Sequence, residues 1–166
     1  MKVIFLDIDG VLNTEIYVRH FFNIATFGKT KSCHDEFGVL FDSVAVEWLS
    51  YIINETGAEI VISSTWKYNG LGSLVSMWEK RKLPGRIIGI TPTIKSDQSL
   101  SFKERAERGN EIRAWLENNP EVESCVIIDD DDDMLEYQMP FFIQTDPIYG
   151  ITGREAESAI RILNDK

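Results

Sequence analysis

The sequence predicts a single α/β domain of the Rossmann-like type, spanning residues 1–166, in which a central parallel sheet lies between two layers of helices. Two observations predict this three-layer fold. Short apolar strand candidates alternate with helical patterns along the chain, and such alternation is typical of parallel βαβ units. Polar clusters also follow strand candidates directly. Because ligands of open parallel sheets bind beyond the carboxyl ends of the strands, the fold class also predicts where a functional site lies.

The strand candidates are short apolar runs with β-branched and aromatic members, which strands favour. They are Lys2–Leu6, Glu59–Ile62, Cys125–Ile128 and Phe141–Gln144, with Arg86–Ile90 as a fifth. The first contains the uninterrupted apolar run Val3-Ile4-Phe5-Leu6. We therefore expect this first run to form a buried core strand.

Helical patterns lie between the strand candidates. Ser43–Thr56 carries Trp48, Leu49 and Ile52 at helical spacing, and Gly57 supplies a stop. The other helical patterns are Leu71–Lys82, Gly109–Asn119 and Gly153–Asn164. Two segments, Glu15–Phe41 and Thr91–Glu107, fit neither a strand nor a helix. Unpatterned stretches of this length in a compact domain are often functional loops or lids.

The composition favours a globular protein from a reducing compartment. With 43% hydrophobic residues and four tryptophans, the chain has enough apolar material for a full core. No apolar stretch approaches the ~20 residues that span a bilayer. Cys33 and Cys125 match no disulfide or metal-binding spacing, so we expect a cytoplasmic protein with no membrane partner. The net charge of −10 disfavours broad binding along a nucleic-acid backbone, which requires a basic surface.

Two carboxylates follow the first strand candidate. Asp7 and Asp9 stand at positions i and i+2, so both side chains leave an extended chain on the same side. Burial of an ionised carboxylate is costly unless a cation or hydrogen bonds compensate it. The pair therefore indicates either a cation between the two side chains or a reaction that needs both of them.

The other polar clusters also stand at the carboxyl ends of strand candidates. These clusters are Ser63-Ser64-Thr65, Asp129–Asp133 and Thr145-Asp146. In a parallel sheet these strand ends meet at one edge. We therefore expect the clusters to gather at the same edge as Asp7 and Asp9.

The polar clusters resemble motifs of the haloacid dehalogenase (HAD) superfamily of phosphatases and phosphotransferases. The first family motif is an apolar strand followed by Asp-x-Asp-Gly-x-x, which Asp7-Ile8-Asp9-Gly10-Val11-Leu12 fits. The second is a strand that ends in Ser or Thr. Ile60-Val61-Ile62-Ser63 fits this second motif, with Ser64 as a neighbouring candidate.

The later family motifs follow in the expected order. The third is a cation near the start of a helix, for which Arg108 fits best and Lys103 competes. Arg replaces the commoner Lys here, but it keeps the charge and binds phosphate with a planar fork. The fourth motif is a strand followed by acids, in which Asp129 pairs either with Asp130 or with Asp133.

Three further stretches resemble a subgroup of small HAD members, some of which are associated with nucleic-acid end repair. They are the Ser-Ser-Thr-Trp-Lys run, the helix Arg-Gly-x-Glu-Ile-x-x-Trp-Leu and the ending Thr-Asp-Pro-x-x-Gly-Ile-Thr. No insertion is long enough for an independent cap domain. The resemblance therefore implies a HAD fold with a minimal cap and an open active site.

The resemblance implies a Mg²⁺-dependent phosphohydrolase that forms an aspartyl-phosphate. Asp7 is then the nucleophile, and Asp9 is the general acid for the leaving oxygen and later the base for water. Ser63 donates a hydrogen bond to the phosphoryl group, and Arg108 neutralises its charge. Each of these residues also has a structural alternative, such as a turn for Asp9 or an exposed surface position for Arg108.

The resemblance also implies the metal ligands, and position at the predicted edge of the sheet indicates the substrate contacts. The Mg²⁺ ligands are the Asp7 carboxylate, the Asp9 carbonyl oxygen and Asp129, with Asp130 or Asp133 as a further ligand or as the residue that orients a bound water. Asp131 and Asp132 belong to a solvated acidic loop. The substrate-binding candidates are Ser64, the amides around Gly10, Trp66 and Lys67. For Trp66, ordinary packing is the alternative to stacking on a substrate ring.

Three functions stay open at this point. The first is a phosphohydrolase that cleaves phosphate monoesters, whose open site suits bulky phosphorylated substrates. The second is a polynucleotide 3′-phosphatase that grips only a nucleic-acid end, which a basic strip of Lys67, Arg81, Lys82 and Lys103 would support. The third is a non-catalytic HAD-fold module that binds a partner. Intact Asp7 and Asp9 argue against this third function.

Overall fold

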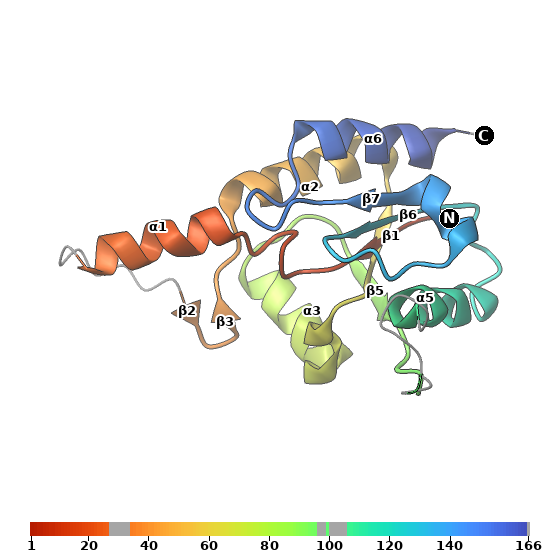
Figure 1. The fold of residues 1–166 in the computed structure, drawn as a ribbon, viewed down its shortest axis with the longest axis horizontal. Coiled ribbons are helices and arrows are strands. Elements are labelled where there is room, and N and C mark those ends of the chain that lie inside the picture. Colours follow the sequence, from red (N-terminus) through yellow and green to blue (C-terminus); the bar gives the residue numbers. More distant parts are fainter. Residues whose placement is uncertain (27–33, 96–98, 100–105, 166) are drawn as a thin grey trace.

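The computed structural model describes residues 1–26, 34–95, 99 and 106–165. Its centre is a five-stranded sheet with the strand order β5-β4-β1-β6-β7 (Figure 1). The strands are β1 (Lys2–Leu6), β4 (Glu59–Ile62), β5 (Ile87–Ile90), β6 (Ser124–Asp129) and β7 (Phe142–Gln144). Every neighbouring pair in this sheet is parallel. The predicted α/β architecture with a central parallel sheet is therefore confirmed.

Helices cover both faces of the sheet because alternate residues of its buried strands point to opposite sides. Ile4 and Leu6 of β1 pack in the larger core cluster with α2 (Ser43–Thr56), α3 (Leu71–Lys80) and α6 (Gly153–Asn164). Val3 and Phe5 pack on the other face with α5 (Glu107–Glu117). Figure 1 shows α2 and α6 on one side of the sheet and α5 on the other. This double cover explains why β1 carries an unbroken apolar run.

Local capping explains where two of these helices begin and end. The Asp42 side chain accepts a hydrogen bond from the Val44 amide at the start of α2, and Gly57 ends this helix with φ 65°. Thr152 caps α6 and exchanges hydrogen bonds with Glu155 in a capping box. The predicted bounds of α2 and α6 agree with the structure.

The predicted bounds of β1 and β4 also agree with the structure, and the other predicted bounds differ by one or two residues. β6 extends one residue beyond Cys125–Ile128 at each end, and α3 ends at Lys80 instead of Lys82. α5 begins at Glu107, two residues before the predicted Gly109. Its early start has a tertiary cause, since the Asp133 side chain accepts a hydrogen bond from the Arg108 amide.

The expectation that Glu15–Phe41 contains no regular element is wrong. The segment forms α1 (Glu15–Thr26) and a short hairpin of β2 (His34–Asp35) and β3 (Gly38–Val39). In Figure 1, α1 projects from the body of the molecule. Tyr17, Phe21 and Ile24 stand at positions i, i+4 and i+7 of this segment, a spacing typical of a helix, so the sequence carried a helical pattern that the expectation overlooked.

Two short 3₁₀ helices complete the described elements, η1 (Thr65–Asn69) after β4 and η2 (Glu136–Phe141) before β7. Among the described residues, no helix combines the length and the apolarity that crossing a bilayer requires.

Candidate active site

The candidate site lies at the carboxyl edge of the sheet, where backbone hydrogen bonds continue one residue past the strands. The Asp7 amide donates to the Ile128 carbonyl oxygen at 3.0 Å, and the Ser63 amide donates to Leu6 at 2.9 Å. These bonds hold Asp7 beside the end of β6 and Ser63 beside the end of β1. The structure therefore brings together the polar clusters that the sequence placed after these strands.

Three carboxylates converge at this edge. Asp7, Asp129 and Asp130 each offer an oxygen atom, and these atoms lie within 4.8 Å of one another. Asp7 is 5% exposed and Asp129 is 1% exposed. The Asp129 Oδ2 atom has no hydrogen-bond donor in the described part of the chain. Oxygen ligands of this kind and spacing fit a hard divalent cation such as Mg²⁺.

Burial shifts the titration of these carboxylates. Desolvation raises the pKa of Asp7 to about 7 and that of Asp129 to about 8, although the nearby charge of Arg108 opposes both shifts. Burial also raises the pKa of Asp130. A bound divalent cation would favour the ionised forms, so the donor set is one that a metal would stabilise.

Arg108 supplies the positive charge that the structure places at the site. Its Nη1 donates a hydrogen bond to the Ser63 carbonyl oxygen. Its Nη2 lies 3.6 Å from Asp7 Oδ1, and its Nε lies 3.2 Å from Asp129 Oδ2, without hydrogen-bond geometry in the second contact. The competing third-motif residue, Lys103, lies outside the described residues.

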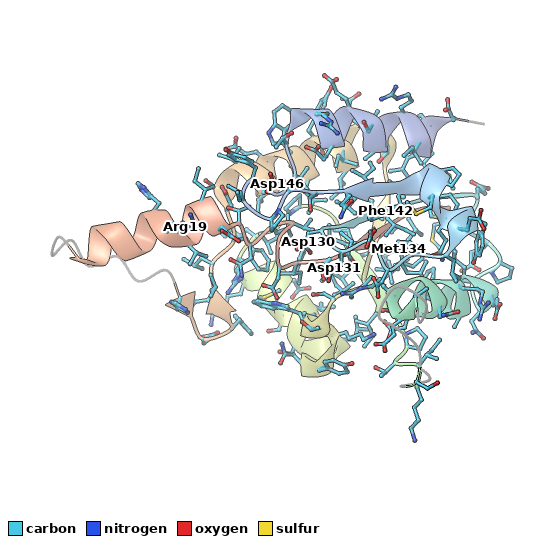
Figure 2. All side chains as sticks on the ribbon, viewed as in Figure 1. Arg19, Asp130, Asp131, Met134, Phe142 and Asp146 are labelled. Atoms are coloured by element: carbon cyan, nitrogen blue, oxygen red, sulfur yellow. The ribbon has the colours of Figure 1, made fainter. Side chains whose placement is uncertain are left out.

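The five-Asp run divides into different environments. Asp129 and Asp130 join the carboxylate cluster, whereas Asp133 is buried and its Oδ2 accepts from the Arg108 amide at 3.1 Å. Asp133 therefore caps the helix that carries Arg108. Asp131 and Asp132 are exposed, which agrees with the predicted acidic loop. In Figure 2, Asp130 and Asp131 lie near the middle of the molecule, far from Arg19 on α1.

Both serines of the second motif are buried, but they make different contacts. The Ser63 hydroxyl has no hydrogen-bond partner among the described residues, which makes it available to a ligand. The Ser64 hydroxyl bonds with Asp7, which lowers the pKa of Asp7, and accepts from the Trp66 amide at 3.4 Å. Ser64 therefore orients the carboxylate and caps η1 at the same time.

Asp9 is exposed, yet neighbouring residues fix its carboxyl group. Its Oδ1 accepts from Asn13 Nδ2 at 2.8 Å, and its Oδ2 accepts from the Trp66 indole at 3.0 Å. The Trp66 ring also meets Phe41 edge to face at 5.6 Å. Trp66 thus packs and holds Asp9. Sequence reasoning missed Asn13, whose only signal was its place four residues after Asp9 in the same loop.

Gly10 serves the site in a way that the sequence did not predict. Its amide donates to the Asn13 carbonyl oxygen at 2.9 Å, so this amide is engaged in the loop, and substrate binding by the neighbouring amides stays a prediction. A Cβ atom at Gly10 would lie 2.5 Å from the Asp130 carboxyl carbon. Glycine is therefore required here because Asp130 approaches the backbone closely.

Lys67 also makes contacts that the sequence did not predict. It is buried, and its Nζ donates to Glu111 Oε2 at 2.5 Å and to the Pro92 carbonyl oxygen at 3.1 Å. Its ammonium group is therefore engaged in a buried ion pair, and contact with a substrate phosphate stays a prediction. Glu111 was missed in the sequence, where its signal is a position one helical turn after Arg108.

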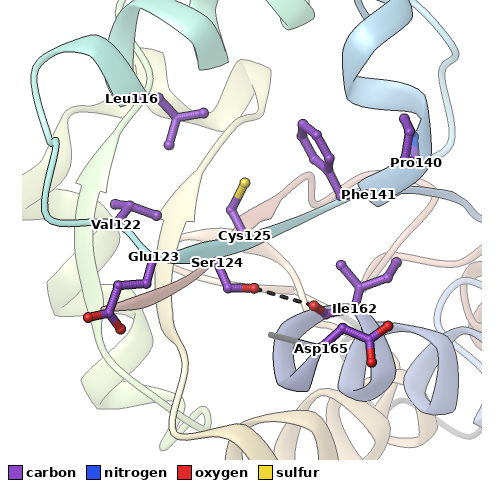
Figure 3. A pocket seen from close by; sticks show the side chains of 9 residues that line it. All are labelled: Leu116, Val122, Glu123, Ser124, Cys125, Pro140, Phe141, Ile162 and Asp165. Atoms are coloured by element: carbon purple, nitrogen blue, oxygen red, sulfur yellow. Dashed lines mark hydrogen bonds between the residues drawn. The ribbon is translucent and has the colours of Figure 1, made fainter.

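A cleft of about 200 Å³ opens beside Arg108. It is lined by Thr65, Lys67, Tyr68, Glu107, Arg108, Glu111, Asp131 and Asp133. A second hollow, of about 490 Å³, lies at the amino end of β6 around Cys125 and Phe141 (Figure 3). This second hollow is at the opposite end of the strand from Asp129, so it is no part of the carboxylate site.

Comparison with protein-family models gives a match over residues 3–156 to the family described as "HAD domain in Swiss Army Knife RNA repair proteins". The match spans all four motifs and nearly the whole chain. It confirms the resemblance to HAD domains of nucleic-acid repair proteins, and it supports a hydrolase of the phosphatase type in general. Neither the curated proteins nor the solved structures gave a match.

Proposed function

This chain belongs to the family of HAD domains in Swiss Army Knife RNA repair proteins, and from that premise we propose that it is a Mg²⁺-dependent phosphohydrolase of phosphate monoesters. One observation carries the proposal. Asp7, Asp129 and Asp130 meet within 4.8 Å at the carboxyl edge of the sheet, with the Arg108 guanidinium against Asp7 and Asp129. Carboxylates and one cation in this arrangement suit phosphoryl transfer.

The proposed reaction uses Asp7 and Asp9 in two steps. An Asp7 oxygen attacks phosphorus, the bond from phosphorus to the leaving oxygen breaks, and Asp9 gives its proton to that oxygen. Water then attacks the aspartyl-phosphate, Asp9 takes a proton from this water, and phosphate leaves. The hydrogen bonds from Trp66 and Asn13 to the two Asp9 oxygens support the second step in particular, because they hold an accepting carboxyl group in one orientation.

The surrounding groups stabilise charge in this scheme. Arg108 would neutralise the negative charge that develops on the transferred group, and the buried Ser63 hydroxyl, which has no partner among the described residues, can donate to a phosphoryl oxygen. Asp7, Asp129 and Asp130 would hold Mg²⁺, whose charge offsets the repulsion between these carboxylates and the phosphate.

An aryl-phosphate assay tests this function. We expect the purified protein to hydrolyse the substrate with Mg²⁺ and to stop when EDTA is added. Asp7→Asn should abolish turnover and keep the circular dichroism spectrum, because the amide has the same shape but is no nucleophile. Asp165→Asn, at the opposite end of the molecule, is the matched control. Full activity in Asp7→Asn would refute the nucleophile assignment.

A second candidate function is removal of a phosphate from a nucleic-acid 3′ end. Tyr68 favours it, because this residue is 69% exposed and lines the cleft beside Arg108, where a terminal base could stack on its ring. The predicted basic strip gives this function little support, because two of its four residues are neutralised. Lys67 pairs with Glu111, and Arg81 pairs with Asp35. Terminal stacking is therefore the stronger support.

Oligonucleotides that carry a 3′-phosphate or a 5′-phosphate separate the two functions. If the substrate is a 3′ end, we expect a higher kcat/KM for that oligonucleotide than for an aryl phosphate. Tyr68→Ala should then lower the oligonucleotide value by about 10-fold or more, as loss of one stacking contact would. Equal values for all substrates would leave only the general phosphohydrolase.

A further inference from the structure

Lys67 and Glu111 form a buried ion pair that joins two parts of the site. Lys67 is 5% exposed and Glu111 is 7% exposed. The ammonium group of Lys67 donates to Glu111, to the Pro92 carbonyl oxygen and to the Thr91 hydroxyl at 3.5 Å. An ammonium group has three N–H donors, so all of them have an acceptor. The pair ties η1, which follows the second motif, to α5.

Glu111 is also a neighbour of Arg108. The two residues stand three positions apart on α5, a spacing that puts side chains on the same helix face. Both line the cleft beside the carboxylates, and the charge of Glu111 acts on the Arg108 guanidinium. Glu111 can therefore compete with Asp7 and Asp129 for the Arg108 guanidinium.

We propose that Lys67 is a positioning residue, which neutralises Glu111 and so leaves the Arg108 guanidinium free to stay at the phosphate site. The inference rests on the proposed function for the role of Arg108, but it assigns a new role to the Lys67–Glu111 pair. Without Lys67, the buried Glu111 carboxylate loses this counter-ion, and in the described part of the chain Arg108 is a cation on which the charge of Glu111 already acts. Breaking a buried pair from one side leaves such an uncompensated charge.

Kinetics of three variants test the inference. Lys67→Met keeps the length of the side chain and removes its charge, and we expect kcat/KM for the aryl phosphate to fall by about 10- to 100-fold, as for a displaced catalytic group. The Ki for inorganic phosphate should rise in parallel. The double variant Lys67→Met/Glu111→Gln should recover most of this loss, because the competitor for Arg108 is gone. Glu111→Gln alone should lose less than Lys67→Met.

A purely structural pair gives the opposite pattern. Either single variant would then leave one buried charge unpaired, so both would lose activity to a similar degree along with stability. A double variant no more active than Lys67→Met, in protein that is folded by circular dichroism, would overturn the inference. If Lys67→Met does not fold, Glu111→Gln and the double variant can still be compared. The inference predicts similar activity for both, and clearly different activities would contradict it.

A spectroscopic readout separates this inference from the proposed function. The Nε–H signal of Arg108 in a ¹⁵N NMR spectrum, assigned with Arg108→Lys, should move in Lys67→Met and return in the double variant. Absence of wild-type turnover would refute the proposed function, whereas an unmoved signal in Lys67→Met would refute the inference. The matched controls are Arg86→Met and Arg86→Met/Glu59→Gln, which remove an ion pair remote from the site. They should change neither kcat/KM nor the position of the Arg108 Nε–H signal.

Discussion

At Gly10 the backbone has φ 72°, and the missing side chain leaves the space that the Asp130 carboxyl group fills. We expect Gly10→Ala to abolish Mg²⁺ binding, because the Asp130 carboxyl group must move away from the added methyl group. Turnover should fall by about 100-fold or more, the loss of rate that a displaced group in an active site causes. The positive φ should add about 1–2 kcal/mol of destabilisation. Aryl-phosphate kinetics measure turnover, isothermal calorimetry measures Mg²⁺ binding, and urea unfolding measures the loss of stability.

Gly57 offers a matched control for this change. It has φ 65°, but a Cβ atom there would meet nothing within 4 Å. Gly57→Ala should therefore show the loss of stability and keep both Mg²⁺ binding and turnover. If Gly10→Ala bound Mg²⁺ like the wild type, the close approach of Asp130 would have no role in the metal site.

Among the elements, α5 depends on a cap supplied from another part of the chain. The side chain of Asp133 accepts from the Arg108 amide, and Ala106 before the helix provides no side-chain cap. We expect Asp133→Ala to lower the free energy of unfolding by about 1 kcal/mol. Turnover should also fall by about 10-fold or more, because the freed first turn carries Arg108 out of place.

Thr152→Ala separates the loss of stability from the loss of activity. Thr152 caps α6 with a hydrogen bond from the Arg154 amide, and α6 contributes none of the site residues named above. The variant should lose a similar free energy of unfolding in urea and keep its turnover. Equal activities of Asp133→Ala and Thr152→Ala would show that the cap of α5 has no part in placing Arg108.

The same elements show what the sequence could predict. The strand positions could be predicted because each buried strand is a continuous apolar run in the sequence. The carboxylates of Asp7 and Asp129 could be predicted as site residues because they stand directly after such runs. The cap of α5 was not readable, since Asp133 and Arg108 are 25 positions apart. The pairing of Lys67 with Glu111 spans 44 positions, so only packing brings the two together. Helix α1 was missed although Tyr17, Phe21 and Ile24 stand at helical spacing, because the Gly and Lys residues that follow it obscure the pattern over the whole segment Glu15–Phe41.

Across the whole molecule, the two ends of β6 have different characters. The carboxyl end holds the acids of the candidate site, whereas the amino end opens into the hollow of Figure 3, where burial raises the pKa of Cys125 to about 11. The net charge of −10 is therefore partly concentrated at one end of the sheet. Like charges that are buried together oppose folding unless protons or a cation neutralise them.

The stability of the whole protein should therefore respond jointly to pH and to Mg²⁺. Burial raises the pKa of Asp7 to about 7 and that of Asp129 to about 8, above their values in the unfolded chain. The folded, metal-free protein then holds more protons than the unfolded chain. The stability from these groups is complete at pH values below about 4 and is lost as pH rises through the folded pKa values.

Mg²⁺ competes with these protons for the same carboxylates. A saturating concentration should therefore raise Tm more at pH 8 than at pH 6, because binding to the folded state alone stabilises it. Comparing Tm with and without Mg²⁺ at each pH cancels the titration of remote groups. Asp129→Asn removes one of the raised carboxyl groups and a ligand, so its Tm gain should be small at both pH values. An equal gain at pH 6 and pH 8 in the wild type would mean that Mg²⁺ binds without displacing protons from Asp7 and Asp129.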